Sequence, residues 1–334
     1  MPTKYIKRDT TYRHRSHSGQ KAEPTGTAAD LNLATLSGLF ADEDAAREYL
    51  ESRLWPNGPV CPHCKHPEAY ALTARPGSTK PVRKGVYKCK KCRQQFTVRV
   101  GTIFEDSKIP LCKWLMALHL LTSSKKGISS LQISREVGIT PKSAWFLTHR
   151  IREAMRDDGP PHLLNGTVEC DETYVGGKQS GAFGRTVGQK KAVMVLVERD
   201  GSARALPIER VTGAELKGAI RVYVSEDSKI VTDDFPSYRG IGKEFAGGHS
   251  TVKHSAKEYV NKMGEHTNTA ESFFALLKRG HYGTFHQLSK KHIHRYADEF
   301  SFRWNHRRVS DGERMNAAIK GVKGKRLMYT QSCA

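Results

Sequence analysis

Residues 167–175 read Thr-Val-Glu-Cys-Asp-Glu-Thr-Tyr-Val, and this predicted β-strand decides the fold because it carries acidic side chains within it. A strongly apolar strand, a hairpin turn at Asp200-Gly201 and a third strand follow it. A helix and a short fourth strand come next. The expected bounds of these four later elements are 192–198, 203–208, 214–224 and 229–232. Three antiparallel strands, a helix and one more strand are the element order of an RNase H-like α/β core.

Two carboxylates occupy key places in this predicted sheet. Asp171 lies inside the first strand, and Asp233 follows the fourth strand directly. The first and fourth strands are neighbours in an RNase H-like sheet, so the two side chains can meet. A charge inside a central strand is costly unless it is paired or bound to metal, and a shared divalent cation would explain both residues. Glu169, Glu172 and Asp234 remain alternative ligands, and strand alternation places Glu169 on the face of Asp171.

A third carboxylate, Glu271, lies in a predicted helix over residues 266–280. At 100° per residue, Phe273, Leu276 and Leu277 form one apolar face. Glu271 and Lys278 are seven positions apart and nearly eclipse each other on the other side. Spacing alone favours an exposed Glu–Lys surface pair over a functional site.

The surrounding sequence contains several blocks of a known family. They lie at 168–178, 232–233, 254–255, 257–260, 266–274, 277–280, 283–286, 295–296, 299–300 and 303–305. The strongest block is His266-Thr-Asn-Thr-Ala-Glu-Ser-Phe-Phe, and the first contains Asp-Glu-Thr-Tyr-Val-Gly-Gly-Lys. With them the chain resembles bacterial insertion-sequence DDE transposases of the ISXO-like group, which is related to the Merlin transposons. The similarity runs from about the first cysteines to residue 307.

This resemblance implies a DDE integrase-type core with Asp171, Asp233 and Glu271 as the catalytic, metal-binding triad. It implies two Mg²⁺ ions, replaceable by Mn²⁺, with Asp171 bridging both ions and the other two carboxylates holding one each. Lys278 and Arg279 would contact phosphates of the transposon end. The implied function is a transposase that binds terminal inverted repeats, cleaves DNA strands and joins them to target DNA. Two ends must be brought together, so a homodimer or larger assembly on double-stranded DNA is expected.

Two alternatives to this function remain at the level of sequence. One is a transposase-derived DNA-binding protein without catalysis, against which the three intact carboxylates weigh. The other is an RNase H-like nuclease that cuts without joining, which the sequence barely separates from a transposase.

Upstream of the core, Cys61-Pro-His-Cys64 and Cys89-Lys-Lys-Cys92 form two CxxC pairs. Each pair can offer two thiolates to one tetrahedral ion, and the spacing between the pairs suits a zinc ribbon with one structural Zn²⁺. A redox function for the pairs is the alternative, and their basic flanks argue against it. His63 and His66 are competing ligands, but four cysteines already complete a site.

Residues 127–152 predict a helix-turn-helix. Ser129 can cap the first helix, Gly138 makes the turn, and Thr140-Pro141 starts the second helix. We expect the second helix to enter a DNA groove, with Lys142 and Arg150 as contact residues. The residues expected to be exposed on it are Lys142, Ser143, His149, Arg150 and Arg152. A plain helical hairpin is the alternative.

The charge of the chain agrees with a nucleic-acid partner. Its 334 residues include 55 Lys and Arg and 34 Asp and Glu, which gives a formal net charge of +21. General solubility rarely needs so large a positive charge, whereas nucleic-acid binding does. No run of about 18 apolar residues predicts a membrane span, and the polar first residues lack a signal core, so a cytoplasmic protein associated with the nucleoid is expected. The expected segments are a basic disordered tail (1–25), a short helical segment (26–54), the zinc ribbon (55–104), the helix-turn-helix region (105–157), the catalytic domain (158–310) and a C-terminal tail (311–334).

Overall fold

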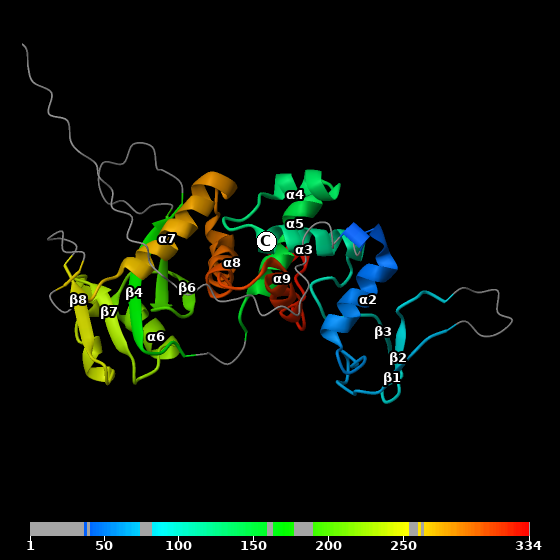
Figure 1. The fold of residues 1–334 in the computed structure, drawn as a ribbon, viewed down its shortest axis with the longest axis horizontal. Coiled ribbons are helices and arrows are strands. Elements are labelled where there is room, and N and C mark those ends of the chain that lie inside the picture. Colours follow the sequence, from blue (N-terminus) through cyan, green and yellow to red (C-terminus); the bar gives the residue numbers. More distant parts are fainter. Residues whose placement is uncertain are drawn as a thin grey trace, which may run out of the picture.

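The computed structural model describes residues 37–38, 41–73, 82–158, 163–176, 190–253, 260–261 and 264–333. The expected tail over residues 1–25 lies outside this part of the chain. Figure 1 shows a five-stranded sheet domain at one end, a small three-stranded sheet at the other, and a group of helices between them. No helix within the described ranges is long and apolar enough to cross a membrane.

The small sheet is the zinc-ribbon segment. Its strands are β1 (Ala69–Ala71), β2 (Tyr87–Cys89) and β3 (Gln95–Phe96), paired antiparallel in that order. Helix α2 (Glu43–Leu54) precedes it, with the Asp42 carboxylate accepting hydrogen bonds from the first backbone N–H groups. The rings of Trp55, Tyr87 and Phe96 pack together beside the cysteines.

The middle of the molecule is a helical unit. It contains α3 (Leu111–Ser123), α4 (Ser130–Val137) and α5 (Pro141–Met155), together with α9 (Asp311–Lys320) and α10 (Tyr329–Cys333) from the end of the chain. The expected signals hold for α4 and α5: Ser129 and Thr140 cap the two helices, and Gly138 joins them with a φ of 65°. Two helices joined by this turn are therefore confirmed as local structure.

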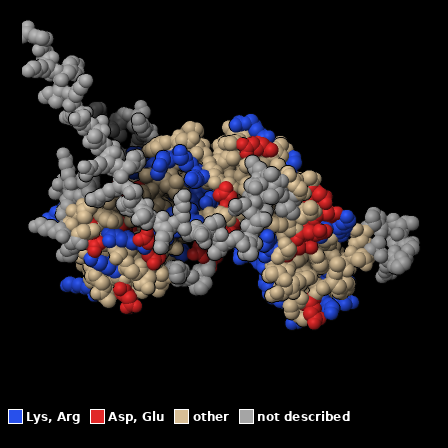
Figure 2. Space-filling model, in the orientation of Figure 1, with Lys and Arg blue, Asp and Glu red and all other residues tan. Residues whose placement is uncertain are grey.

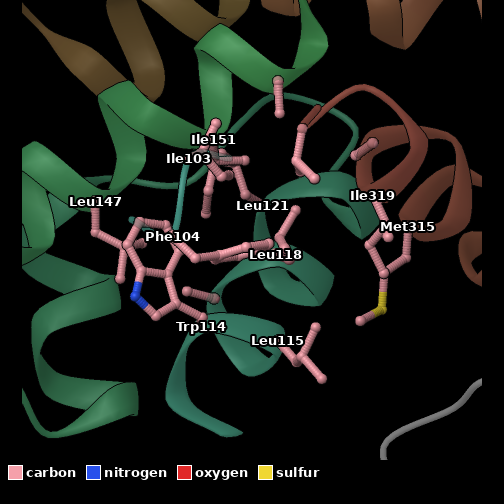
Figure 3. Packing of buried hydrophobic residues seen from close by; sticks show 14 of the residues in the cluster. Ile103, Phe104, Trp114, Leu115, Leu118, Leu121, Leu147, Ile151, Met315 and Ile319 are labelled. Atoms are coloured by element: carbon pink, nitrogen blue, oxygen red, sulfur yellow. The ribbon is translucent and has the colours of Figure 1, made fainter. Parts of the chain in front are cut away.

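The C-terminal segment differs from the expectation. We expected a tail over residues 311–334, but α9 packs against α2 and α3, and Met315, Ala318 and Ile319 are fully buried. Figure 3 shows side chains of α3, α5 and α9 converging in one apolar cluster. The prediction is wrong because the apolar face of this helix packs against helices from the N-terminal half of the chain.

The five-stranded sheet contains β4 (Thr167–Val175), β5 (Lys191–Glu198), β6 (Ala203–Ile208), β7 (Lys229–Asp233) and β8 (His249–Val252). The spatial order is β6-β5-β4-β7-β8. The pairs β4–β5 and β5–β6 are antiparallel, whereas β4–β7 and β7–β8 are parallel. This order fits an RNase H-like core, and β8 is a strand that the sequence pattern did not show.

Helices cover both faces of this sheet. Helix α6 (Gly213–Tyr223) packs against Met194 and Leu196 on one face. Helices α7 (Asn268–Gly280) and α8 (Ile293–Asn305) pack against Val193, Val195 and Val197 on the other face. Successive β5 residues thus alternate between two cores, as a strand buried on both sides requires. Helix α8 also contacts α5 and so joins the sheet domain to the helical unit.

Candidate functional site

The sheet register brings two of the predicted carboxylates side by side. Strands β4 and β7 are parallel neighbours, with Val168 opposite Ile230 and Glu169 opposite Val231. Continued by two residues, this register places Asp171 next to Asp233. Asp171 is also opposite Val195 of β5, so its side chain is on the sheet face that α7 covers.

Helix α7 adds the third carboxylate to the same face. Phe273 and Leu277 anchor the helix in the core formed with β5, and Glu271 lies in its first turn with an exposed side chain. The backbone N–H of Glu271 donates to the carbonyl of Thr267 (3.0 Å), so this residue is inside the regular helix. The amphipathic spacing alone did not distinguish this position from an exposed surface pair.

The three carboxylates influence one another electrostatically. The pKa of Asp171 is raised to about 7, mainly by burial and in smaller part by the charges of Glu172, Asp233 and Glu271, against a hydrogen bond from the backbone N–H of Glu172. The negative charges of Asp233 and Glu271 thus both act on the buried carboxyl group of Asp171. Their oxygens are also the ligand type that Mg²⁺ prefers, so the donor set fits that ion.

The distances between the three carboxylates bear on whether one cation could bind all of them. Within the described ranges, the four cysteines are the one group of three or more His, Cys, Asp or Glu whose ligand atoms all lie within 4.8 Å of one another. The oxygens of Asp171, Asp233 and Glu271 therefore do not all meet this spacing. Their arrangement does not match a single ion held tightly by all three.

Two of the alternative ligands are engaged elsewhere. The Glu169 carboxylate is fully buried and accepts hydrogen bonds from Arg199 Nε (2.8 Å) and from the first turn of α7. The Glu172 carboxylate accepts the hydroxyl hydrogen bond of Tyr238 (2.6 Å). Burial raises the pKa of Glu172. Asp234 is exposed in the turn after β7.

The far end of α7 is basic. The side chains of Lys278 and Arg279 are exposed, and the Lys278 ammonium lies 6.0 Å from the centre of the Phe274 ring. Arg279 Nε donates to the carbonyl of Ala275 (3.0 Å). Figure 2 shows Lys and Arg side chains gathered over this end of the helix. The surface next to the carboxylates is therefore suited to an anionic chain.

Most of the expected DNA-facing residues of α5 are not exposed. Arg150 is only 4% exposed, donates to the carbonyl of Glu105 (2.6 Å) and stacks on Trp114 and Phe146. Burial lowers the pKa of Arg150 to about 10. His149 and Arg152 are buried as well.

The assignment of Arg150 as an exposed DNA contact is therefore wrong. Residues 147–155 are buried without interruption because α3, α4, α8, α9 and α10 surround this half of α5. Lys142, at the start of α5, is exposed as expected, with its ammonium 5.0 Å from the centre of the Tyr329 ring. This leaves the N-terminal end of the helix as its accessible part.

The four ribbon cysteines converge as predicted. The sulfur atoms of Cys61 and Cys92 are 3.6 Å apart, as are those of Cys64 and Cys89. Four sulfurs each about 2.3 Å from a tetrahedral zinc are separated by about 3.8 Å. The cluster therefore fits zinc, and the two histidines that competed as ligands are not part of it.

Comparison with known proteins now identifies the family. Residues 163–305 match the model of the ISXO2-like transposase domain, and residues 41–95 match that of the transposase zinc-ribbon domain. The chain belongs to the ISXO2-like transposases. The matched zinc-ribbon segment includes α2 as well as the cysteines of both CxxC pairs.

One curated relative of this transposase agrees with that assignment. An uncharacterized protein in the transposable element ISH50 of Halobacterium salinarum is 29% identical over 260 residues, which is 72% of this chain and 83% of the relative. A Mos1 transposase paired-end complex with the left transposon end covers 63% of this chain and 79% of its own, at 14% identity and a TM-score of 0.25. A pre-cleavage Mos1 transpososome covers 58% and 78%, at 14% identity and a TM-score of 0.20. These two structural likenesses are remote, and the fold described above rests on the strand order.

Proposed function

We propose that this transposase binds the terminal inverted repeats of an insertion sequence and performs metal-dependent DNA strand cleavage and strand transfer. The observation that carries the proposal is the placement of Asp171 beside Asp233 on neighbouring strands, with Glu271 on the helix that covers them. The charges of Asp233 and Glu271 both act on Asp171, so the three form one electrostatic unit.

The three carboxylates offer the oxygen ligands that a centre of two Mg²⁺ ions would need. Such ions lie about 3.5–4 Å apart and would activate the attacking oxygen and stabilise the leaving oxygen of an in-line displacement. Asp171, which senses both other carboxylates, would bridge the ions, while Asp233 and Glu271 would each bind one. Mn²⁺ could take the place of Mg²⁺ in this donor set.

Basic residues outside the carboxylate site, together with the zinc ribbon, would bind and orient the DNA. Lys278 and Arg279 present positive charge on the helix that carries Glu271, where they can hold phosphates of the transposon end. The exposed N-terminal end of α5 with Lys142 would contact the duplex, and the ribbon would add a second contact. The attacking group is water and then a 3′-hydroxyl, so no protein nucleophile is required. Both transposon ends must meet at one assembly, which requires a homodimer or larger complex on the DNA.

Nicking and joining separate this function from its alternatives. The purified chain is incubated with labelled transposon ends, a target plasmid and Mg²⁺, and the products are resolved on a sequencing gel. We expect 3′-end nicking and joined product, both lost in Asp171→Asn and both retained in Asp227→Asn, which removes an exposed carboxylate of the same domain. Nicking without joining would identify a nuclease. Binding with neither product would identify a DNA-binding protein without catalysis.

A further inference from the structure

The first turn of α7 is capped by a residue from a distant strand. The N-cap residue Thr267 makes no side-chain capping hydrogen bond. The Glu169 carboxylate of β4 accepts from the backbone N–H groups of Thr269 (2.8 Å) and Ala270 (3.1 Å), and from the Thr269 hydroxyl (2.9 Å). A helix leaves its first N–H groups without intrahelical partners and favours negative charge at that end. Glu169 therefore supplies both the acceptor and the charge that this helix end needs.

The capping carboxylate is itself held in place. Arg199 Nε donates to Glu169 (2.8 Å), and the same guanidinium donates to the carbonyl of His266 (2.9 Å) and pairs with Glu265 (2.8 Å). Lys229 of β7 completes the network through Glu265 (2.5 Å). These contacts fix the segment that leads into α7 against β4 and β7. Glu169 is 0% exposed, and burying a carboxylate is costly unless partners such as these bind it.

On both β4 and α7, the residues that form the cap are next to or near the proposed metal ligands in the sequence. Glu169 precedes Asp171 by two residues on the same face of β4, and Ala270, which it binds, directly precedes Glu271. We propose that Glu169 is a positioning residue that fixes α7 on β4 and thereby holds Glu271 at its working distance from Asp171. This inference rests on the proposed function, because it concerns the geometry of that metal centre. Partners that orient metal ligands typically contribute 10–100-fold to metal affinity.

The test uses the full-length, zinc-loaded chain and measures Mn²⁺ binding directly. Mn²⁺ is titrated without DNA and followed by electron paramagnetic resonance, at a temperature well below the unfolding midpoint of every variant. Glu169→Gln keeps the shape of the side chain and removes its charge, and Thr269→Val removes one of its donors. Glu105→Gln is the matched control, since Glu105 also accepts a backbone N–H bond (2.8 Å from Gly101) and pairs with Arg326, but far from α7. Hydrogen exchange at Thr269 and Ala270 reports whether the cap is lost.

We expect Glu169→Gln to weaken Mn²⁺ binding by about 10–100-fold and to speed exchange at the start of α7. Thr269→Val should have a smaller effect in the same direction, and Glu105→Gln should leave both quantities unchanged. A metal affinity within threefold of the wild type in Glu169→Gln would overturn the inference, as would an equal loss in the control. The variant Asp171→Asn distinguishes a failure of the positioning role from a failure of the proposed metal centre. If it abolishes Mn²⁺ binding while Glu169→Gln does not alter it, only the positioning role fails; if it leaves Mn²⁺ binding unchanged, the proposed metal centre itself fails.

Discussion

One buried carboxylate joins α8 to α5, and its removal should destabilise the protein strongly. Glu299 of α8 is 0% exposed and binds Arg152 of α5 through Nε (2.5 Å) and Arg303 through Nε (3.1 Å). Arg303 donates to the carbonyls of Leu121 (2.8 Å) and Ser124, at the end of α3. Three segments of the chain therefore meet at this carboxylate.

The magnitude follows from the two arginines that Glu299→Gln would leave behind. Arg152 and Arg303 are almost fully buried, and in the part of the chain that the structure describes neither pairs with another carboxylate. Removing one member of a buried ion pair costs about 3–5 kcal/mol, because the remaining charge stays desolvated. Two arginines share this carboxylate, so we expect a loss of unfolding free energy at the upper end of that range. Stacking of Arg152 over Tyr296 (4.2 Å to the ring centre) is retained in the variant and offsets part of the loss.

The stability difference between wild type and Glu299→Gln should change with pH in a direction that can be checked. Burial alone would raise the pKa of Glu299, but Arg152 and Arg303 outweigh it and lower the pKa below its ordinary value of 4.5. A carboxyl whose pKa is lower in the folded state stabilises the protein fully at pH values above its unfolded pKa. The contribution is lost as the pH falls through the lowered folded pKa. The difference between wild type and Glu299→Gln should therefore be complete at pH 7 and shrink at pH values below about 4.5.

Urea unfolding at pH 7, followed by tryptophan fluorescence, measures the loss, with Trp114 and Trp145 reporting on the helical unit. The control is Glu244→Gln, which breaks an exposed pair with Arg221 (2.6 Å) and should barely move the midpoint. A midpoint shift in Glu299→Gln no larger than that of the control would refute the reasoning. An undiminished difference at acidic pH would refute the assignment to the ionised carboxylate.

Two further predictions concern the metal and the DNA. Cys61→Ser should remove the zinc, about one ion per chain by elemental analysis, because three remaining thiolates leave the tetrahedral site open; full retention of zinc would contradict the ribbon site. Lys278→Ala should weaken binding to end DNA of any sequence and reduce the slope of log K against log salt by about one, measured by fluorescence anisotropy. An unchanged slope would show that Lys278 does not contact a phosphate.

Sequence reasoning succeeded where a short-range pattern determines the outcome. Element order predicted that β4 and β7 are neighbours, so that Asp171 and Asp233 could meet, and the observed register of the two strands places these residues side by side. The two CxxC pairs predicted the cysteine cluster because each pair spans a tight turn and only one tetrahedral site fits four thiolates. Capping residues marked the starts of α4 and α5 for the same local reason.

The failures have a common physical cause, which is packing between segments distant in the chain. Arg150 has the spacing of an exposed residue, but α5 is enclosed by helices from both ends of the sequence. The helix α9 supplies part of that enclosure, and nothing in residues 311–334 alone shows where its apolar face is buried. Glu169 was equally ambiguous, because alternation gives its face but only the position of α7 shows what its carboxylate binds.

Two buried carboxylates therefore connect α5 to the candidate metal centre. Glu299 fixes α5 on α8, α8 follows α7 along the chain, and Glu169 fixes α7 on the strand that carries Asp171. Neither side chain is exposed, so neither is available to touch DNA, and both are bound by arginine. A DNA duplex held by the helical unit would be aligned with the carboxylates only while both links are intact. The free energy of binding the repeats could then help to position the scissile phosphate. A displacement of about 1 Å there is enough to lower the rate of the chemical step strongly.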